Sequence, residues 1–97
     1  MSLQVEVVSY AKDRLEVRLR GEGHTILNML VDELNSDPRV TAAYRIEHPL
    51  VDVAYLFIAT DGSKTPLDAL TEAAVRLHEK IEALKKQLEA GFPHLER

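Results

Sequence analysis

Cysteine is absent from this 97-residue sequence, which excludes disulfide bonds and thiolate metal sites. No apolar run approaches the roughly 20 residues that a membrane-spanning helix needs. The N-terminal residues have neither the basic start nor the long apolar run of a signal peptide. These absences suit an intracellular chain that makes no membrane contact.

Clusters of basic side chains are also absent. The 16 acidic and 12 basic residues give a net charge of −4 and are spread evenly along the chain. Binding to a nucleic-acid backbone needs clustered Lys and Arg, so we expect little or no direct nucleic-acid contact. Arg14, Arg18 and Arg20 lie in one predicted strand region, together with Glu16. This pattern is typical of a solvated sheet face, and a nucleic-acid contact there is the alternative.

Catalytic and metal-binding patterns are missing as well. No two of the four histidines lie at a metal-ligand spacing such as His-x-x-x-His. The segment 21–25 lacks the third glycine and the lysine of nucleotide-binding loops, so we interpret it as a strand-to-helix turn. We therefore predict no catalytic residue, no metal site and no cofactor. The expected places of the histidines are a cap or interface for His24, a strand end for His48, solvent for His78 and a tail for His94.

The composition describes a small folded domain. Hydrophobic residues make up 45% of the chain and charged residues 29%, which fits a globular protein rather than a disordered one. We assign residues 1–91 to a single domain and residues 92–97 to a short C-terminal tail. A domain of this size buries only about two-thirds of its unfolded surface, so a partner would add useful stability.

Alternating apolar and polar residues predict the strands. Two of them, about 3–7 and 15–19, form a half-buried hairpin with a turn at 11–14. A third strand covers about 39–47. A fourth, about 53–60, is apolar at almost every position, which predicts a central strand or one covered on both faces.

Two helices are predicted between and after these strands. The first begins at a cap, His24 or Thr25, and runs to about Leu34, with Asn35 as a left-handed stop. The second begins after Thr65, because this residue can cap a helix whose first position is proline, and it runs for about 25 residues. The order ββαββα and the short connections favour an antiparallel sheet with helices packed against it.

An apolar stripe follows the second helix with the alternating three- and four-residue spacing of a heptad seam. Its members are Leu67, Leu70, Ala74, Leu77, Ile81, Leu84 and Leu88. The helix is about 37 Å long, which exceeds the sheet of so small a domain, so its second half should overhang. In a monomer, four seam side chains would then stay in water: Leu77, Ile81, Leu84 and Leu88. They would forgo roughly 6–10 kcal/mol of burial free energy, so we expect another chain to cover them. On the solvent side, Glu72 and Arg76 are expected to pair.

Asn28 is a polar residue within an otherwise apolar stretch of the first helix. A buried amide without partners costs about 1–3 kcal/mol. Two interpretations remain open: a hydrogen bond to the local backbone, or a polar contact that sets register across an interface.

Two segments together resemble a known family. Gly-Glu-Gly-His-Thr-Ile-Leu-Asn-Met-Leu (21–30) opens the first helix, and Ala-Ala-Tyr-Arg-Ile-Glu-His-Pro-Leu (42–50) closes the third strand. With the seam, they resemble the small alpha-like assembly subunit family of multisubunit RNA polymerases, in its archaeal form, called L. The matching positions are His24, Thr25, Leu27, Asn28 and Leu30 in the first motif and Tyr44, His48 and Pro49 in the second.

The resemblance implies a fold, a partner and a role. The fold is a two-layer α/β (α+β) arrangement, in which a four-stranded, mainly antiparallel sheet carries both helices on one face. The partner is the larger alpha-like subunit, called D in archaea, and the heterodimer is a cytoplasmic platform for the large catalytic subunits of DNA-directed RNA polymerase. No active site of this nucleotidyltransferase is expected in the chain itself. The implied dimer interface comprises His24, Thr25, Leu27, Asn28, Leu30, Leu34, Leu70, Ala74, Leu77, Ile81, Leu84 and Leu88.

Without the resemblance, the residues leave two further hypotheses. One is a stand-alone homodimeric domain of α+β type that binds a ligand or regulates, and the other is a small nucleic-acid-binding module. The seam favours dimerisation but is compatible with all three. The two motifs favour the assembly subunit.

Overall fold

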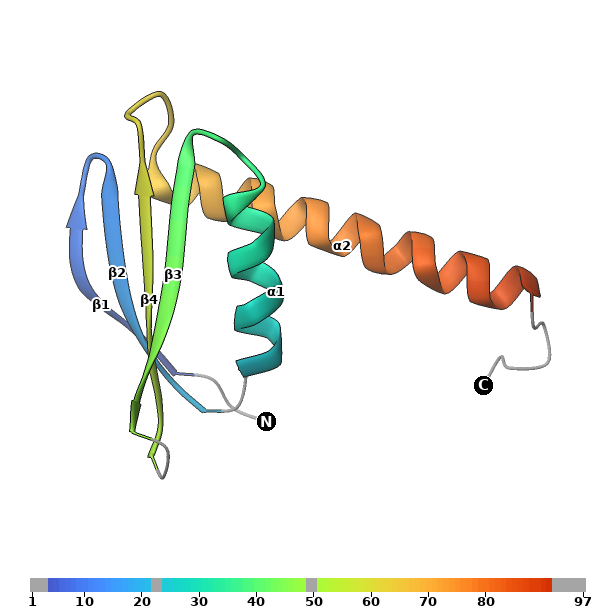
Figure 1. Ribbon diagram of the computed structural model, residues 1–97, viewed down its shortest axis with the longest axis horizontal. Helices are drawn as coiled ribbons and strands as arrows, with labels where there is room; N and C mark the ends of the chain where they lie inside the picture. The colour runs from blue at the N-terminus through green and yellow to red at the C-terminus, as the bar shows by residue number, and fades with distance from the viewer. Residues whose placement is uncertain (1–3, 22–23, 49–50, 92–97) are drawn as a thin grey trace.

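A computed structural model describes residues 4–21, 24–48 and 51–91 of the chain. Its elements are, in order, β1 (Gln4–Ala11), β2 (Arg14–Arg20), α1 (His24–Asn35), β3 (Val40–His48), β4 (Val51–Thr60) and α2 (Pro66–Gly91). The four strands form one antiparallel sheet in the order β1-β2-β4-β3. Both helices lie on the same side of this sheet (Figure 1). The predicted order of elements and the two-layer fold are therefore confirmed.

The core lies between the sheet and the two helices. Its buried members come from every described element except β1: Leu15, Val17, Leu19, Leu27, Leu34, Val40, Ala42, Ala54, Leu56, Ile58, Ala69 and Ala73. The small side chains of Ala69 and Ala73 allow the first turns of α2 to approach the sheet closely.

β4 is the strand that was predicted to be central, and it lies between β2 and β3. The apolar run of β4 is explained by its central position and not by complete cover on both faces. On the helix side Leu56 and Ile58 are buried, whereas on the opposite side Val53 is buried but Phe57 is exposed.

β1 departs from the predicted half-buried strand, because all eight of its residues are exposed. The strand forms the edge of the sheet, on the far side from α1 (Figure 1). The helices of this chain cover the other three strands and leave this edge open.

The ends of the helices show one confirmed prediction and two corrections. Thr65 caps α2, since its hydroxyl accepts a hydrogen bond of 3.1 Å from the backbone N–H of Asp68. α1 already begins at His24, so Thr25 lies inside the helix and is not its cap. Asn35 is not a left-handed stop, because no described residue other than glycine has a positive φ. Its side-chain amide instead bonds the backbone N–H and C=O of Ala42, at 2.8 and 2.9 Å, and so fastens the end of α1 to β3.

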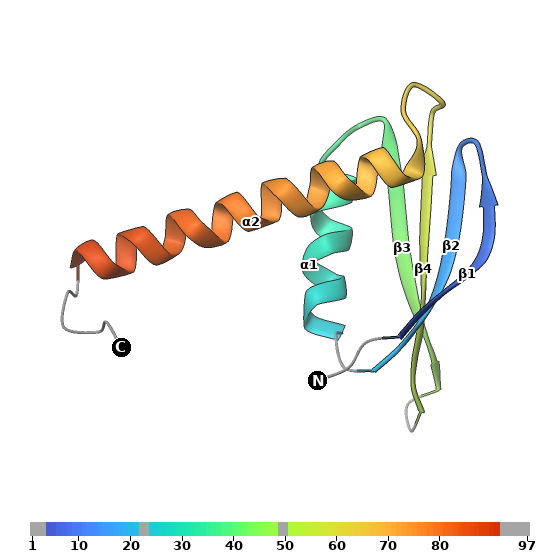
Figure 2. The same ribbon diagram turned by 180° about the vertical axis from the view of Figure 1, so that it is seen from behind.

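α2 leaves the sheet after its first turns instead of lying along it (Figures 1 and 2). Its buried residues are Pro66, Ala69 and Ala73, all in the first third of the helix. The radius of gyration is 15.7 Å, above the roughly 13 Å of a compact domain of this length. The predicted overhang is therefore present, and it is longer than a helix lying on the sheet would leave.

Candidate protein–protein interface

The seam of α2 touches the core at only one of its first members and ends in solvent, since Leu67, its first residue, is already 54% exposed. Leu70 packs on the core, and Leu77 is half-buried. Beyond them Ile81, Leu84 and Leu88 are 49%, 57% and 47% exposed. A row of apolar side chains on a helix that projects from its own domain is the surface that a partner would cover.

α1 also carries exposed apolar side chains. Ile26 and Met29 are exposed, while Leu30 is half-buried against the core. The predicted interface included Leu30 but left out Ile26 and Met29. The available signal was that they fall outside the spacing of the buried positions, Leu27 and Leu34, and are nevertheless apolar.

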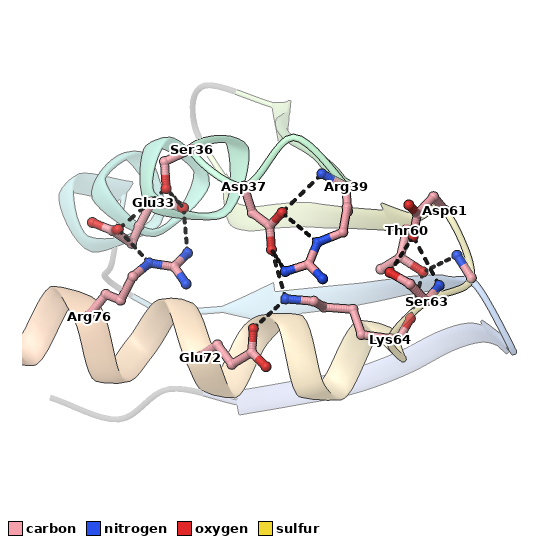
Figure 3. A network of polar contacts seen from close by, with 11 residues as sticks. Glu33, Ser36, Asp37, Arg39, Thr60, Asp61, Ser63, Lys64, Glu72 and Arg76 are labelled. Carbon is pink, nitrogen blue, oxygen red and sulfur yellow. Dashed lines mark hydrogen bonds and ion pairs between the residues drawn. The ribbon is translucent and has the colours of Figure 1, made fainter.

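The direction of α2 is set by a buried carboxylate on α1. Glu33 is only 6% exposed, and its two oxygens accept hydrogen bonds from Arg76 Nε and Lys80 Nζ, each at 2.9 Å. The Arg76 guanidinium also donates to the Glu33 backbone carbonyl at 2.9 Å (Figure 3). The bonds from Lys80 and Arg76, in that order, lower the pKa of Glu33. A buried carboxylate is costly without partners, and both partners lie on α2, so this cluster holds the helix at a defined angle to α1.

A second ionic cluster holds the start of α2. Lys64 Nζ lies 2.7 Å from a carboxylate oxygen of Asp37 and also pairs with Glu72 (Figure 3). Asp37 further accepts hydrogen bonds from the backbone N–H and the Nε of Arg39, at 3.0 and 3.1 Å. The bonds from Lys64 and then Arg39 hold the pKa of Asp37 well below its usual range. The turn after α1 is thus tied to the loop that precedes α2 and to the second turn of α2.

These clusters correct the predicted pair within α2. Glu72 and Arg76 do not bind each other, because Glu72 binds Lys64 and Arg76 binds Glu33. Spacing along one helix predicts only neighbours on that helix. The sequence reasoning therefore missed Glu33, Asp37 and Lys64.

Two predicted interface residues belong to the chain's own core. Leu27 is 9% exposed and Leu34 is fully buried, so neither offers surface to another chain. We therefore take both out of the proposed interface. They share the apolar face of α1 with Leu30, and helical spacing alone does not separate residues facing the sheet from residues facing a partner.

The other predicted positions are distributed as follows. Thr25, Asn28 and Ala74 are exposed on the helices. Tyr44 is half-buried and packs against the core from β3. Asn28 makes no side-chain hydrogen bond with the described residues, so the predicted bond to the local backbone is not formed. His24 begins α1 and His48 ends β3, without a described side chain. Pro49, His94 and the tail 92–97 lie outside the described residues.

The described part of the chain contains no group of three or more His, Asp or Glu side chains that is placed to hold a metal ion. Within the same ranges, no helix combines the length and the apolar character needed to cross a membrane. The one histidine whose side chain is described, His78, is exposed on α2. What this geometry offers is a surface for another protein.

The chain was compared with known protein families and proteins. Residues 14–87 match the family described as the RNA polymerase Rpb3/Rpb11 dimerisation domain. DNA-directed RNA polymerase subunit Rpo11 of Pyrococcus furiosus is 40% identical over 91 residues, which cover 91% of this chain and 93% of that protein. Rpo11 of Korarchaeum cryptofilum is 39% identical over 83 residues, or 84% and 85% of the two chains.

A solved structure is similar over almost the whole length. The crystal structure of DNA-directed RNA polymerase subunit L from Thermoplasma acidophilum superposes with a TM-score of 0.82 at 27% identity. The match covers 97% of this chain and 93% of that one.

Proposed function

Because the chain belongs to the RNA polymerase Rpb3/Rpb11 dimerisation family, as a small alpha-like subunit of archaeal type, we propose that it forms a heterodimer with the larger alpha-like subunit, the one called D in archaea. The pair is then the platform on which the large, catalytic polymerase subunits assemble in the cytoplasm. The chain contributes surface and shape, and we assign it no chemical step of nucleotide addition.

The observation that carries this proposal is the projecting half of α2. Its Ile81, Leu84 and Leu88 are about half exposed, whereas full burial of each such side chain contributes roughly 1.5–3 kcal/mol. Ile26 and Met29 add exposed apolar surface on α1. A partner that presents its own pair of helices would complete a shared four-helix core. We expect such an obligate interface to bury on the order of 2,000 Å² or more.

The proposal is tested by comparing two substitutions on adjacent residues. Leu84→Asp places a charge in the stripe, whereas Ala83→Asp places the same charge about 130° away from the stripe's centre on the same exposed helix. When each variant is co-expressed with the larger alpha-like subunit, the complex should form with Ala83→Asp and be lost or strongly weakened with Leu84→Asp. Sedimentation reports the complex, and circular dichroism reports whether the sheet and helices are kept.

Two results would count against the proposal. Equal affinity of both variants for the larger alpha-like subunit would mean that the stripe does not face the partner. A chain that remains a homodimer when the larger subunit is present would favour the stand-alone regulatory domain instead, because a heptad seam allows self-pairing as readily as pairing with another chain.

A further inference from the structure

An apolar strip lies on the edge strand β1, apart from the exposed stripe of α2. It consists of Val5, Val7 and Tyr10, which are 58%, 61% and 52% exposed. In the antiparallel register these residues stand directly opposite the three buried apolar residues of β2, namely Leu19, Val17 and Leu15. Directly opposed residues point to the same face of a sheet, so the β1 strip faces the side on which the helices lie.

The pattern of β1 is that of a strand with one covered face. Glu6, between two members of the strip, points to the other side of the sheet and pairs with Arg18 at 3.1 Å. The strip itself has no cover from the described chain, since every residue of β1 is exposed. Three large apolar side chains on an open edge strand are also a hazard for aggregation, which natural sheets usually avoid. The alternation therefore points to cover supplied by another chain.

We propose that the β1 strip receives the projecting half of the partner's long helix. This inference rests on the proposed heterodimer and adds a second contact to it. An isologous dimer makes each contact twice. We infer an approximate form of this symmetry for a partner of the same fold, so that the surface touched by the end of α2 on the partner has a counterpart here. On this side of the sheet the described chain leaves two apolar places open: the strip on β1, and Ile46 on the opposite edge strand, which is 44% exposed opposite Ala54. The strip is the larger of the two, with three apolar side chains.

The length of α2 agrees with such a contact. Eighteen residues separate its last buried residue, Ala73, from its end at Gly91, and they span about 27 Å. A partner helix that this segment crosses is about 10 Å wide, so the segment extends well past it and onto the partner's sheet. Leu84 and Leu88 lie in this far part, and aliphatic side chains of this kind pack well on valines and on the ring of a tyrosine.

A cross-linking experiment reads the contact directly. A photoreactive benzoylphenylalanine is introduced in place of Tyr10, the full chain is co-expressed with the larger alpha-like subunit, and the cross-linked peptides are mapped by mass spectrometry after irradiation. The expected product joins position 10 to the C-terminal half of the long helix of the larger subunit. A cross-link from position 10 to another region of that subunit would overturn the contact and leave the heterodimer intact. Absence of any complex between the two chains would instead overturn the proposed function.

A matched pair of variants measures how much the contact contributes. Val7→Lys puts a charge on the strip, whereas Ser9→Lys puts the same charge on the same exposed strand but on the opposite face, where Ser9 stands opposite Glu16. Val7→Lys should weaken binding to the larger alpha-like subunit by about tenfold or more, as for other interface anchors, and Ser9→Lys by less than about twofold. Equal affinities of the two variants would overturn the inference. Circular dichroism on both variants separates a lost contact from a lost fold.

Discussion

Glu33 connects the sequence to the direction of the long helix. It is the only charged residue that is buried among those described, and it binds Arg76 and Lys80 of α2. Its pKa is lowered in the folded chain. The ionised carboxylate therefore stabilises the folded chain fully at a pH above 4.5, the ordinary pKa of the group. This stabilisation is lost as the pH falls through the lowered pKa of the folded state.

Replacing this carboxylate should have a pH-dependent effect on stability. Glu33→Gln keeps the shape but removes the charge, and we expect a loss of about 1–2 kcal/mol at pH 7, because Lys80 is largely exposed and its share is screened. The difference between variant and parent should be smaller at pH 3, where the unfolded parent binds a proton at this site. Urea unfolding at both pH values measures it. A difference that stays constant with pH would contradict the role given to the ionised carboxylate.

Two leucines with the same side chain should behave in opposite ways. Leu34 is fully buried in the core and Leu84 is exposed. Leu34→Ala should reduce the free energy of unfolding of the isolated chain by about 2–5 kcal/mol, through lost burial and a cavity. Leu84→Ala should change it by less than about 0.5 kcal/mol, yet weaken the complex with the larger alpha-like subunit. Denaturant unfolding and binding measurements on the two variants test this, and a large stability loss in isolated Leu84→Ala would place that residue in the chain's own core.

Asn28 is exposed on α1 without a hydrogen-bond partner among the described residues, and its role in partner choice stays a prediction. An amide left unpaired against an apolar self-copy would disfavour the homodimer. Asn28→Leu should therefore raise the fraction of homodimer in a mixture with the larger alpha-like subunit, as counted by native mass spectrometry. An unchanged preference for the larger subunit over self would end this idea.

At the scale of elements, α2 has a supported half and an unsupported half. Isolated helical segments shorter than about 12–15 residues are marginal in water, and the part beyond Lys80 has no buried residue to hold it. We predict that backbone amides at 82–91 exchange hydrogen rapidly in the isolated chain and become protected when the larger alpha-like subunit binds. Amides at 69–76 should be protected in both states. Hydrogen exchange followed by mass spectrometry measures these rates. Slow exchange of the amides at 82–91 in the isolated chain would contradict the prediction.

The elements themselves could be predicted from sequence because their signals are local. Alternation identified three strands and an apolar run the fourth, Thr65 identified the start of α2, and the seam identified an overhang. The direction of α2 could not be predicted, because it depends on contacts of Glu33 and Asp37 with residues far along the chain. The buried face of α2 was not predicted either. It is formed by Ala69 and Ala73, each of which comes one residue before a seam member, Leu70 or Ala74.

The candidate interface was predicted in part for the same reason. Ile81, Leu84 and Leu88 were placed correctly as exposed apolar surface, since their distance from the domain follows from helix length. Leu77 was expected to be exposed with them and is half-buried. Leu27 and Leu34 were assigned to the interface although they are buried in the core. α1 has apolar residues on the face that meets the sheet, Leu27 and Leu34, and also on its exposed side, Ile26 and Met29. Only the packed fold shows which of them meet the sheet. The alternating residues of β1 predicted a strand with one apolar face. The sequence could not show which surface packs on that face, because we propose that this surface belongs to another chain.

The whole molecule has the shape of one part of an assembly. It extends over 48 × 36 × 17 Å, with one helix projecting from a sheet whose edge carries apolar side chains. A chain that leaves this much apolar surface uncovered gains stability by mass action when a partner binds. Its thermal stability should therefore rise with the concentration of the larger alpha-like subunit.

Mixing the two purified proteins shows whether this chain pairs with a related, different chain. The purified chain and the larger alpha-like subunit are combined in equal amounts, and sedimentation velocity measures the species present. The account predicts that any homodimer of the chain disappears and that a 1:1 heterodimer takes its place. Persistence of the homodimer, or of the free chain, beside the unbound larger subunit would contradict it.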